Sequence, residues 1–108
     1  MNKIKDSLAR LDEISNLKYN WNGNRAGKFT EQLIEFIREI VKGLDIQPDI
    51  FPTGNSSIQL EYTNKNGDYL EFEIFETKKI HKYTRIGEIN NTEYVDVSDI
   101  NNIVNSFM

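Results

Sequence analysis

Residues 57–76 read SIQLEYTNKNGDYLEFEIFE, and apolar and polar side chains alternate on both sides of a central turn sequence. A period of two is typical of strands with one buried face, and Gly67 suits the positive φ that a short hairpin loop requires. Because residues that oppose each other in a hairpin share a face, the pattern constrains the register. It predicts a three-residue loop, Lys65–Gly67, and three pairs: Tyr62 with Leu70, Leu60 with Phe72, and Ile58 with Ile74.

A third strand is expected in KIHKYTRI, residues 79–86. If residues 77–78 form a two-residue turn, His81 and Tyr83 join the buried face of the sheet. The same register places Lys82 beside Glu73 on the opposite face. Lys82 would then partly neutralise the acidic side of the hairpin.

Shorter strands are expected before and after these three. The segment DIFPTGN, residues 49–55, contains Pro52, which confines a strand to a sheet edge because proline has no backbone N–H. The segment TEYVDV, residues 92–97, predicts the last strand. Ser98 then suits the start of a short C-terminal helix, whose apolar residues recur at helical spacing: Ile100, Ile103, Val104 and Phe107.

The first 44 residues have the spacing of two amphipathic helices. Apolar side chains recur every three or four residues in both, as one buried stripe requires. Thr30 is suited to cap the second helix, and Gly43 is suited to end it in a left-handed conformation. The stripes are Ile4, Leu8, Leu11, Ile14 and Leu17 in the first helix, and Leu33, Phe36, Ile37, Ile40, Val41 and Leu44 in the second.

The order of elements predicts an α+β fold with two layers. Two N-terminal helices, about four to five antiparallel strands in meander order, and a short C-terminal helix follow one another along the chain. Helices segregated from a run of strands typically cover one face of the sheet. With 108 residues, the chain is expected to form a single domain spanning residues 1–108.

Composition excludes several classes of function. A sequence pI near 5.0 and a net charge of −4 argue against a nucleic-acid partner and favour a protein partner with a basic surface. No apolar run is long enough to cross a membrane, and the charged N-terminus does not resemble a secretory signal. The chain has no cysteine and one histidine, so the usual zinc sites are not expected. We expect a cytoplasmic protein without a cofactor or metal.

Residues 20–30, NWNGNRAGKFT, contain two glycines, three asparagines and the only tryptophan. A phosphate-binding loop needs four residues between its glycines, and Lys followed by Ser or Thr, after a strand. Here three residues separate Gly23 from Gly27, Phe29 follows Lys28, and a helix precedes the segment. We therefore interpret the segment as a structured turn in which Trp21 closes one end of the core.

Three segments, YNWNGNRAGKFTEQLIEFIREIV, DIFPTGNSSIQLEYTNKNGDYLEFEIFE and DINNIVNSFM, resemble a widespread group of small bacterial proteins. That group shares an Asn-Trp-Asp-Gly-x-Gly-Ala turn, a helix, a Pro-Thr…Gly-Gly-Ile-x-Leu-Glu-Trp strand and a short final helix. The matching positions are Asn20, Trp21, Gly23, Ala26, Pro52, Thr53, Ile58, Leu60 and Glu61. The departures are Asn22, Arg25, Ser56, Ser57 and Tyr62. The resemblance implies an architecture and no particular chemistry.

The outward face of the hairpin is acidic, because Glu61 opposes Glu71 in the expected register and Glu73 follows on the same side. Like charges directly across a strand pair destabilise a sheet by some tenths of a kcal/mol unless something compensates. Three interpretations are open: a solvated face, a docking surface for a basic partner, and a carboxylate cluster for Mg²⁺.

The function that we expect is the binding of another macromolecule without catalysis, as in antitoxins, immunity proteins or phage-type inhibitors. The expected binding residues are Glu61, Glu71, Glu73 and Lys82, with Trp21 and Arg25 as a second contact. The alternative is a small-ligand or nucleotide-sensing module that uses the asparagine-rich turn around Trp21, and an enzyme ranks third. A homodimer through an open sheet edge is compatible with each of these.

Overall fold

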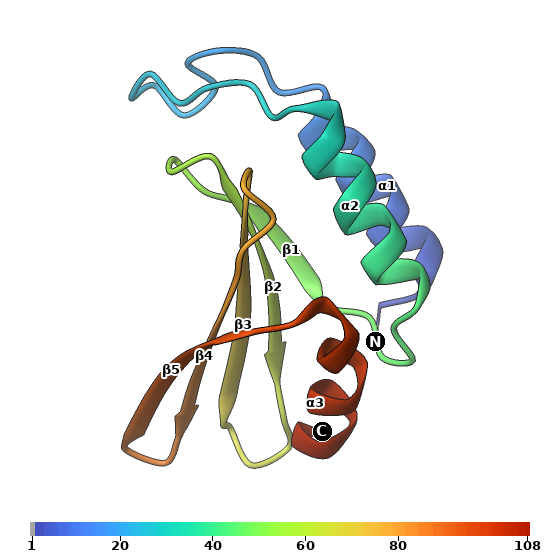
Figure 1. Cartoon of the computed structure of the whole chain (residues 1–108), viewed down its shortest axis with the longest axis vertical. Coiled ribbons are helices and arrows are strands. Elements are labelled where there is room, and N and C mark those ends of the chain that lie inside the picture. The colour runs from blue at the N-terminus through green and yellow to red at the C-terminus, as the bar shows by residue number, and fades with distance from the viewer. Residues whose placement is uncertain (1) are drawn as a thin grey trace.

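A computed structural model describes residues 2–108, which form two layers (Figure 1). Five antiparallel strands make one sheet in the order β1-β2-β3-β4-β5. The strands are β1 (Asp49–Pro52), β2 (Ser57–Thr63), β3 (Tyr69–Phe75), β4 (Ile80–Ile86) and β5 (Ile89–Val95). The helices α1 (Ile4–Ser15), α2 (Glu31–Lys42) and α3 (Ile100–Phe107) lie on one side of the sheet. This arrangement confirms the predicted α+β fold and its meander order.

The predicted register of the central hairpin is confirmed. Tyr62 pairs with Leu70, and the other two predicted pairs follow along the strands. Gly67 has a φ of 82°, so the loop uses the left-handed conformation for which glycine is suited. Every second residue of β2 and β3 is therefore buried against the helices, and the residues between them face away.

The predicted register between β3 and β4 is wrong by one residue. The turn spans three residues, since the Lys78 N–H donates to the Phe75 carbonyl and the Phe75 N–H donates to the Lys79 carbonyl. Lys78 has a φ of 69°, a left-handed conformation that is uncommon for a lysine. A slip of one residue moves every side chain of a strand to the other face. His81 and Tyr83 consequently face away from the helices, and Lys82 faces them.

The end of α2 also differs from the expectation. Gly43 has a φ of −92°, so the helix does not end in a left-handed residue. The carbonyl groups in this region are satisfied differently: the Gln47 side chain donates to the Val41 carbonyl at 2.8 Å and to the Leu44 carbonyl at 3.0 Å. Thr30 does cap the start of α2, because its hydroxyl accepts the Leu33 N–H at 3.2 Å.

The C-terminal helix begins slightly later than expected. A short 3₁₀ turn, Val97–Asp99, precedes α3, and Ser98 lies inside that turn and does not cap the helix. Ile100 and Val104 of α3 join the same buried cluster as α1, α2 and the first four strands.

The helical layer covers the sheet unevenly. In β4 only Ile80 is buried, and in β5 no residue from Ile89 to Val95 is buried. Between α3 and the β4–β5 hairpin lies a groove of about 840 Å³, lined by both apolar and charged side chains. The layers are therefore closely packed at β1–β3 and open toward β5.

Candidate protein-binding face

Three glutamates lie together on the side of the sheet that faces away from the helices. We call this side the open face, and we call Glu61, Glu71 and Glu73 its acidic centre. Glu61 and Glu71 are directly opposite each other on β2 and β3, as predicted, and Glu73 follows on β3. All three are half-buried, because neighbouring strands flank them on both sides. The alternation of β2 and β3 thus places like charges at the middle of the sheet.

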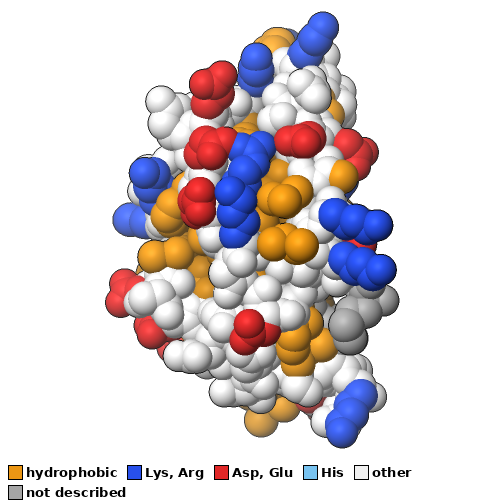
Figure 2. All heavy atoms as spheres, turned by 90° about the vertical axis from the view of Figure 1, so that its right-hand side faces the viewer, with side chains coloured by type: hydrophobic (Ala, Val, Ile, Leu, Met, Phe, Trp, Pro, Cys, Tyr) orange, Lys and Arg blue, Asp and Glu red, His pale blue; other side chains and the backbone are white. Residues whose placement is uncertain are grey.

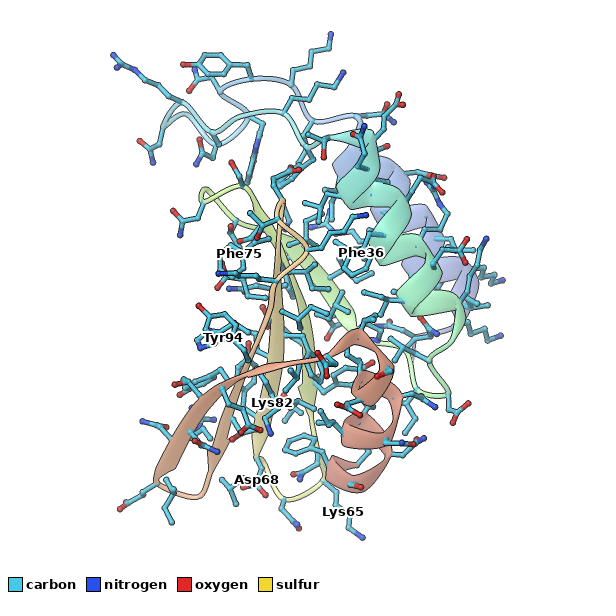
Figure 3. The ribbon with its side chains drawn as sticks, in the orientation of Figure 1. Phe36, Lys65, Asp68, Phe75, Lys82 and Tyr94 are labelled. Carbon is cyan, nitrogen blue, oxygen red and sulfur yellow. The ribbon has the colours of Figure 1, made fainter. Side chains whose placement is uncertain are left out.

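Aromatic side chains border the acidic centre. Tyr83 pairs with Glu71 and His81 pairs with Glu73 across β3 and β4. The Tyr69 and Tyr83 rings lie 6.0 Å apart, and the His81 and Tyr94 rings lie 5.2 Å apart. Tyr94 is 68% exposed, and in Figure 3 Tyr94 and Phe75 point away from the helical layer. The open face therefore combines negative charge with accessible aromatic surface.

The site is electrostatically strained at Glu61. Burial raises the pKa of the Glu61 carboxyl, and the negative charges of Glu71 and Asp49 raise it further, while hydrogen bonding from Tyr69 acts in the opposite direction. The Tyr69 hydroxyl donates to Glu71 Oε1 at 2.8 Å. Burial and the adjacent carboxylates raise the pKa of Tyr69, so its hydroxyl stays protonated and remains a donor.

Glu73 is held from the side by a buried hydroxyl chain. The Ser57 hydroxyl is fully buried and donates to Glu73 Oε2 at 2.5 Å. Ser57 Oγ and Thr53 Oγ1 lie 2.5 Å apart, and the Thr53 hydroxyl also accepts the Asn55 N–H. The Ser57 hydroxyl orients Glu73 and partly satisfies its carboxylate, as the Tyr69 hydroxyl does for Glu71.

Charged side chains are paired on the helical side of the molecule but not in the acidic centre of the open face. On the helical side, basic and acidic side chains are interspersed (Figure 2), and several form ion pairs. Arg38 pairs with Asp12 and Glu35, and Lys42 pairs with Glu39. Among residues 2–108, by contrast, no Lys, Arg or His forms an ion pair with any member of the acidic centre. The acidic centre thus holds three half-buried carboxylates that pair with no cation of residues 2–108.

Lys82 does not belong to this face, contrary to the expectation from the sequence. It lies on the helix-facing side (Figure 3) and pairs with Glu93 at 2.8 Å in the groove beside α3. The cause is the three-residue turn before β4. The same one-residue slip brings His81 and Tyr83 to the open face, although the sequence analysis placed them on the buried face. The sequence signal against that register was the assumed two-residue turn, since neither Thr77 nor Lys78 favours the backbone conformation of such a turn.

Trp21 and Arg25 lie in the turn between α1 and α2, which Figure 1 shows at the far end of the helices from α3. The Trp21 ring packs 6.0 Å from that of Phe29, and its indole N–H donates to the Gly27 carbonyl at 3.2 Å. Arg25 is exposed, with a φ of 64°. The structure therefore does not join this second predicted contact to the acidic centre.

The asparagines of this turn bind its own backbone. Asn22 Oδ1 accepts the N–H groups of Asn24 and Ala26, at 2.8 and 3.2 Å. Asn20 Oδ1 accepts the Arg25 N–H at 2.7 Å. These side-chain oxygens hold the loop in place, as expected for a structured turn.

Within residues 2–108, no three His, Asp or Glu side chains are grouped so as to hold a metal ion, and no helix is long and apolar enough to cross a membrane. Comparisons with protein-family models, with curated proteins and with solved structures found no match to this chain.

Proposed function

We propose that this chain is a non-enzymatic, cytoplasmic protein that binds another protein through its open face. The observation that carries the proposal is the acidic centre, whose three half-buried glutamates have no ion-pair partner within residues 2–108. Half-burial weakens the hydration of the carboxylates, so an incoming guanidinium or ammonium group gains more there than at a fully exposed glutamate. The partner therefore carries Lys or Arg at the centre of its contact.

The aromatic border supports a protein partner over a free ion. Tyrosine side chains are enriched in the centres of protein interfaces, because they bury a large area and still offer a hydroxyl. Tyr83 is half-buried beside Glu71, and Tyr94 is exposed beside His81, the neighbour of Glu73. A small acidic protein that covers a basic surface would act as a neutralising partner, and antitoxins, immunity proteins and phage-type inhibitors are the classes that we favour. This last step rests on an analogy of size and charge.

The test is affinity purification of the tagged chain from its host at low salt, with mass spectrometry of the proteins that co-elute. We expect a stoichiometric partner that is released at high salt, since salt screens the attraction between the glutamates of the acidic centre and the basic groups of the partner. The double variant Glu61→Gln, Glu71→Gln keeps one oxygen acceptor in each side chain but removes two negative charges, and it should lose the partner.

The matched control is Glu13→Gln, Glu39→Gln on the helical side, whose side chains are 69% and 70% exposed. This variant changes the net charge by the same amount and should retain the partner. Retention of the partner by the first variant, or equal loss by both, would contradict a contact at the acidic centre.

A further inference from the structure

The two edges of the sheet differ in how they are protected. At β1, Pro52 has no backbone N–H, and the Arg10 side chain donates from Nε to the Ile50 carbonyl at 3.0 Å. Asn2 donates to the Pro48 carbonyl at 3.0 Å just before the strand. A short strand with proline and side chains laid along it is a protected edge. β1 therefore does not accept another strand.

β5 has none of these protections. It spans seven residues, Ile89–Val95, pairs with β4 without a bulge, and contains neither proline nor glycine. Its one charged side chain, Glu93, is paired with Lys82. After Val95 the chain turns back over the sheet toward α3 and leaves the edge uncovered (Figure 1). Ile89 is 75% exposed on this strand. A long, regular and uncovered edge is the usual place at which another strand adds to a sheet.

The turn before β5 shows which backbone groups are free. Ile86 pairs with Ile89 across the two-residue turn formed by Gly87 and Glu88, with a φ of 62° at Gly87. In such a hairpin the flanking pair exchanges both hydrogen bonds, and the pattern alternates along the strand. The N–H and C=O groups of Asn90, Thr92 and Tyr94 consequently point away from β4, toward the uncovered edge.

We propose that β5 pairs with β5 of a second copy of this chain, antiparallel and centred on Thr92. This register matches all seven residues: Thr92 opposes Thr92, Asn91 opposes Glu93, Asn90 opposes Tyr94, and Ile89 opposes Val95 of the other copy. It sets apolar against apolar at both ends and opposes no like charges. A shift of two residues toward Val95 would oppose Tyr94 with itself and leave Ile89 unpaired, while a twofold axis at Glu93 would oppose two carboxylates. The result is a continuous ten-stranded sheet with twofold symmetry.

The first experiment measures mass by light scattering across a concentration series. The mass should rise from that of one chain, 12.6 kDa, toward twice that value. Thr92→Lys opposes two like charges at the symmetry axis, and Thr92→Pro removes an N–H that points to the edge and not to β4; both should remain monomeric with an unchanged circular dichroism spectrum. Thr77→Lys, in the exposed β3–β4 turn, is the matched control and should dimerise.

The second experiment tests the register, and it also detects a weak dimer. The chain has no cysteine, so a single introduced cysteine can form a disulfide only between two copies. A residue on a twofold axis meets itself at a distance that a disulfide spans, whereas Asn90 lies four residues from its own copy. Thr92→Cys should cross-link rapidly under mild oxidation, and Asn90→Cys and Thr77→Cys should not. A wild-type chain that stays monomeric at every concentration, together with Thr92→Cys that links no faster than Thr77→Cys, would overturn the proposal. Faster linking of Asn90→Cys would overturn the register.

Discussion

At the scale of single residues, the informative group is Glu61, because three effects act on one carboxyl. Burial and two neighbouring carboxylates raise its pKa from the ordinary value of 4.5, and hydrogen bonding from Tyr69 compensates in part. An acid whose pKa is higher in the folded state binds more protons when folded. The contribution of Glu61 to the free energy of unfolding therefore decreases as the pH rises from the ordinary pKa through the raised pKa of the folded state. At neutral pH, Glu61 is ionised in both states and its destabilising effect is complete.

This sign predicts the behaviour of Glu61→Gln. The variant should melt at a higher temperature than the wild type at pH 7, and the difference should shrink toward zero as the pH falls below about 4, where both states are protonated. Thermal unfolding followed by circular dichroism at several pH values measures this difference. Glu39→Gln, on the exposed side of α2, is the matched control for the loss of one negative charge. A constant difference between Glu61→Gln and wild type at all pH values would contradict the raised pKa.

At the scale of elements, the sequence predicts one hairpin correctly and the next one incorrectly, for a physical reason. In the hairpin around Gly67, two independent signals predict the same register: the strict alternation of both strands, and a glycine at the loop position that needs a positive φ. KIHKYTRI does not alternate apolar with charged side chains, and its turn places Lys78 at a φ of 69° without a glycine to signal it. The two ends of α2 differ in the same way. The N-terminal cap is correctly predicted, because Thr30 accepts a hydrogen bond from nearby Leu33. The left-handed end expected at Gly43 is absent, and the Gln47 side chain, from beyond the helix, donates to the Val41 carbonyl instead.

The corrected register makes a prediction about Lys82, whose side chain is 15% exposed and paired with Glu93. Glu93→Gln leaves a mostly buried ammonium group without its carboxylate, and we expect a loss of about 1–2 kcal/mol in the free energy of unfolding. Adding Lys82→Met should recover most of this loss, because the unpaired charge is then removed. Urea unfolding measures both, with Glu88→Gln in the neighbouring turn as control. If Lys82 were instead beside Glu73, Glu93→Gln would have no effect and Glu73→Gln would be the costly change.

At the scale of the whole molecule, the sequence predicts the structure under the helical layer better than it predicts where that layer ends. The periodicities assign most of the core and the order of layers, because burial on one face determines the pattern in both helices and strands. Ile50 and Ile80 are buried outside the predicted sets, and Ile4 of the predicted stripe is 43% exposed. They do not show how far the helices extend across the sheet. That extent depends on how α3 packs against the common core, and it leaves β5 and one side of the groove uncovered.

The two proposals together predict how a partner would dissociate. Pairing of β5 strands would join two open faces into one, with an acidic centre in each half, so a dimer would present two equal binding sites. On a surface that carries the captured partner at high density, the wild type should dissociate more slowly than Thr92→Pro, because rebinding of the second site is intramolecular. At low density, or with the partner free in solution, both should bind each site with the same affinity, since Thr92→Pro changes no charge of the acidic centre. Surface plasmon resonance at two densities measures this, and a Thr92→Pro variant that binds weakly even in solution would show that β5 itself contacts the partner.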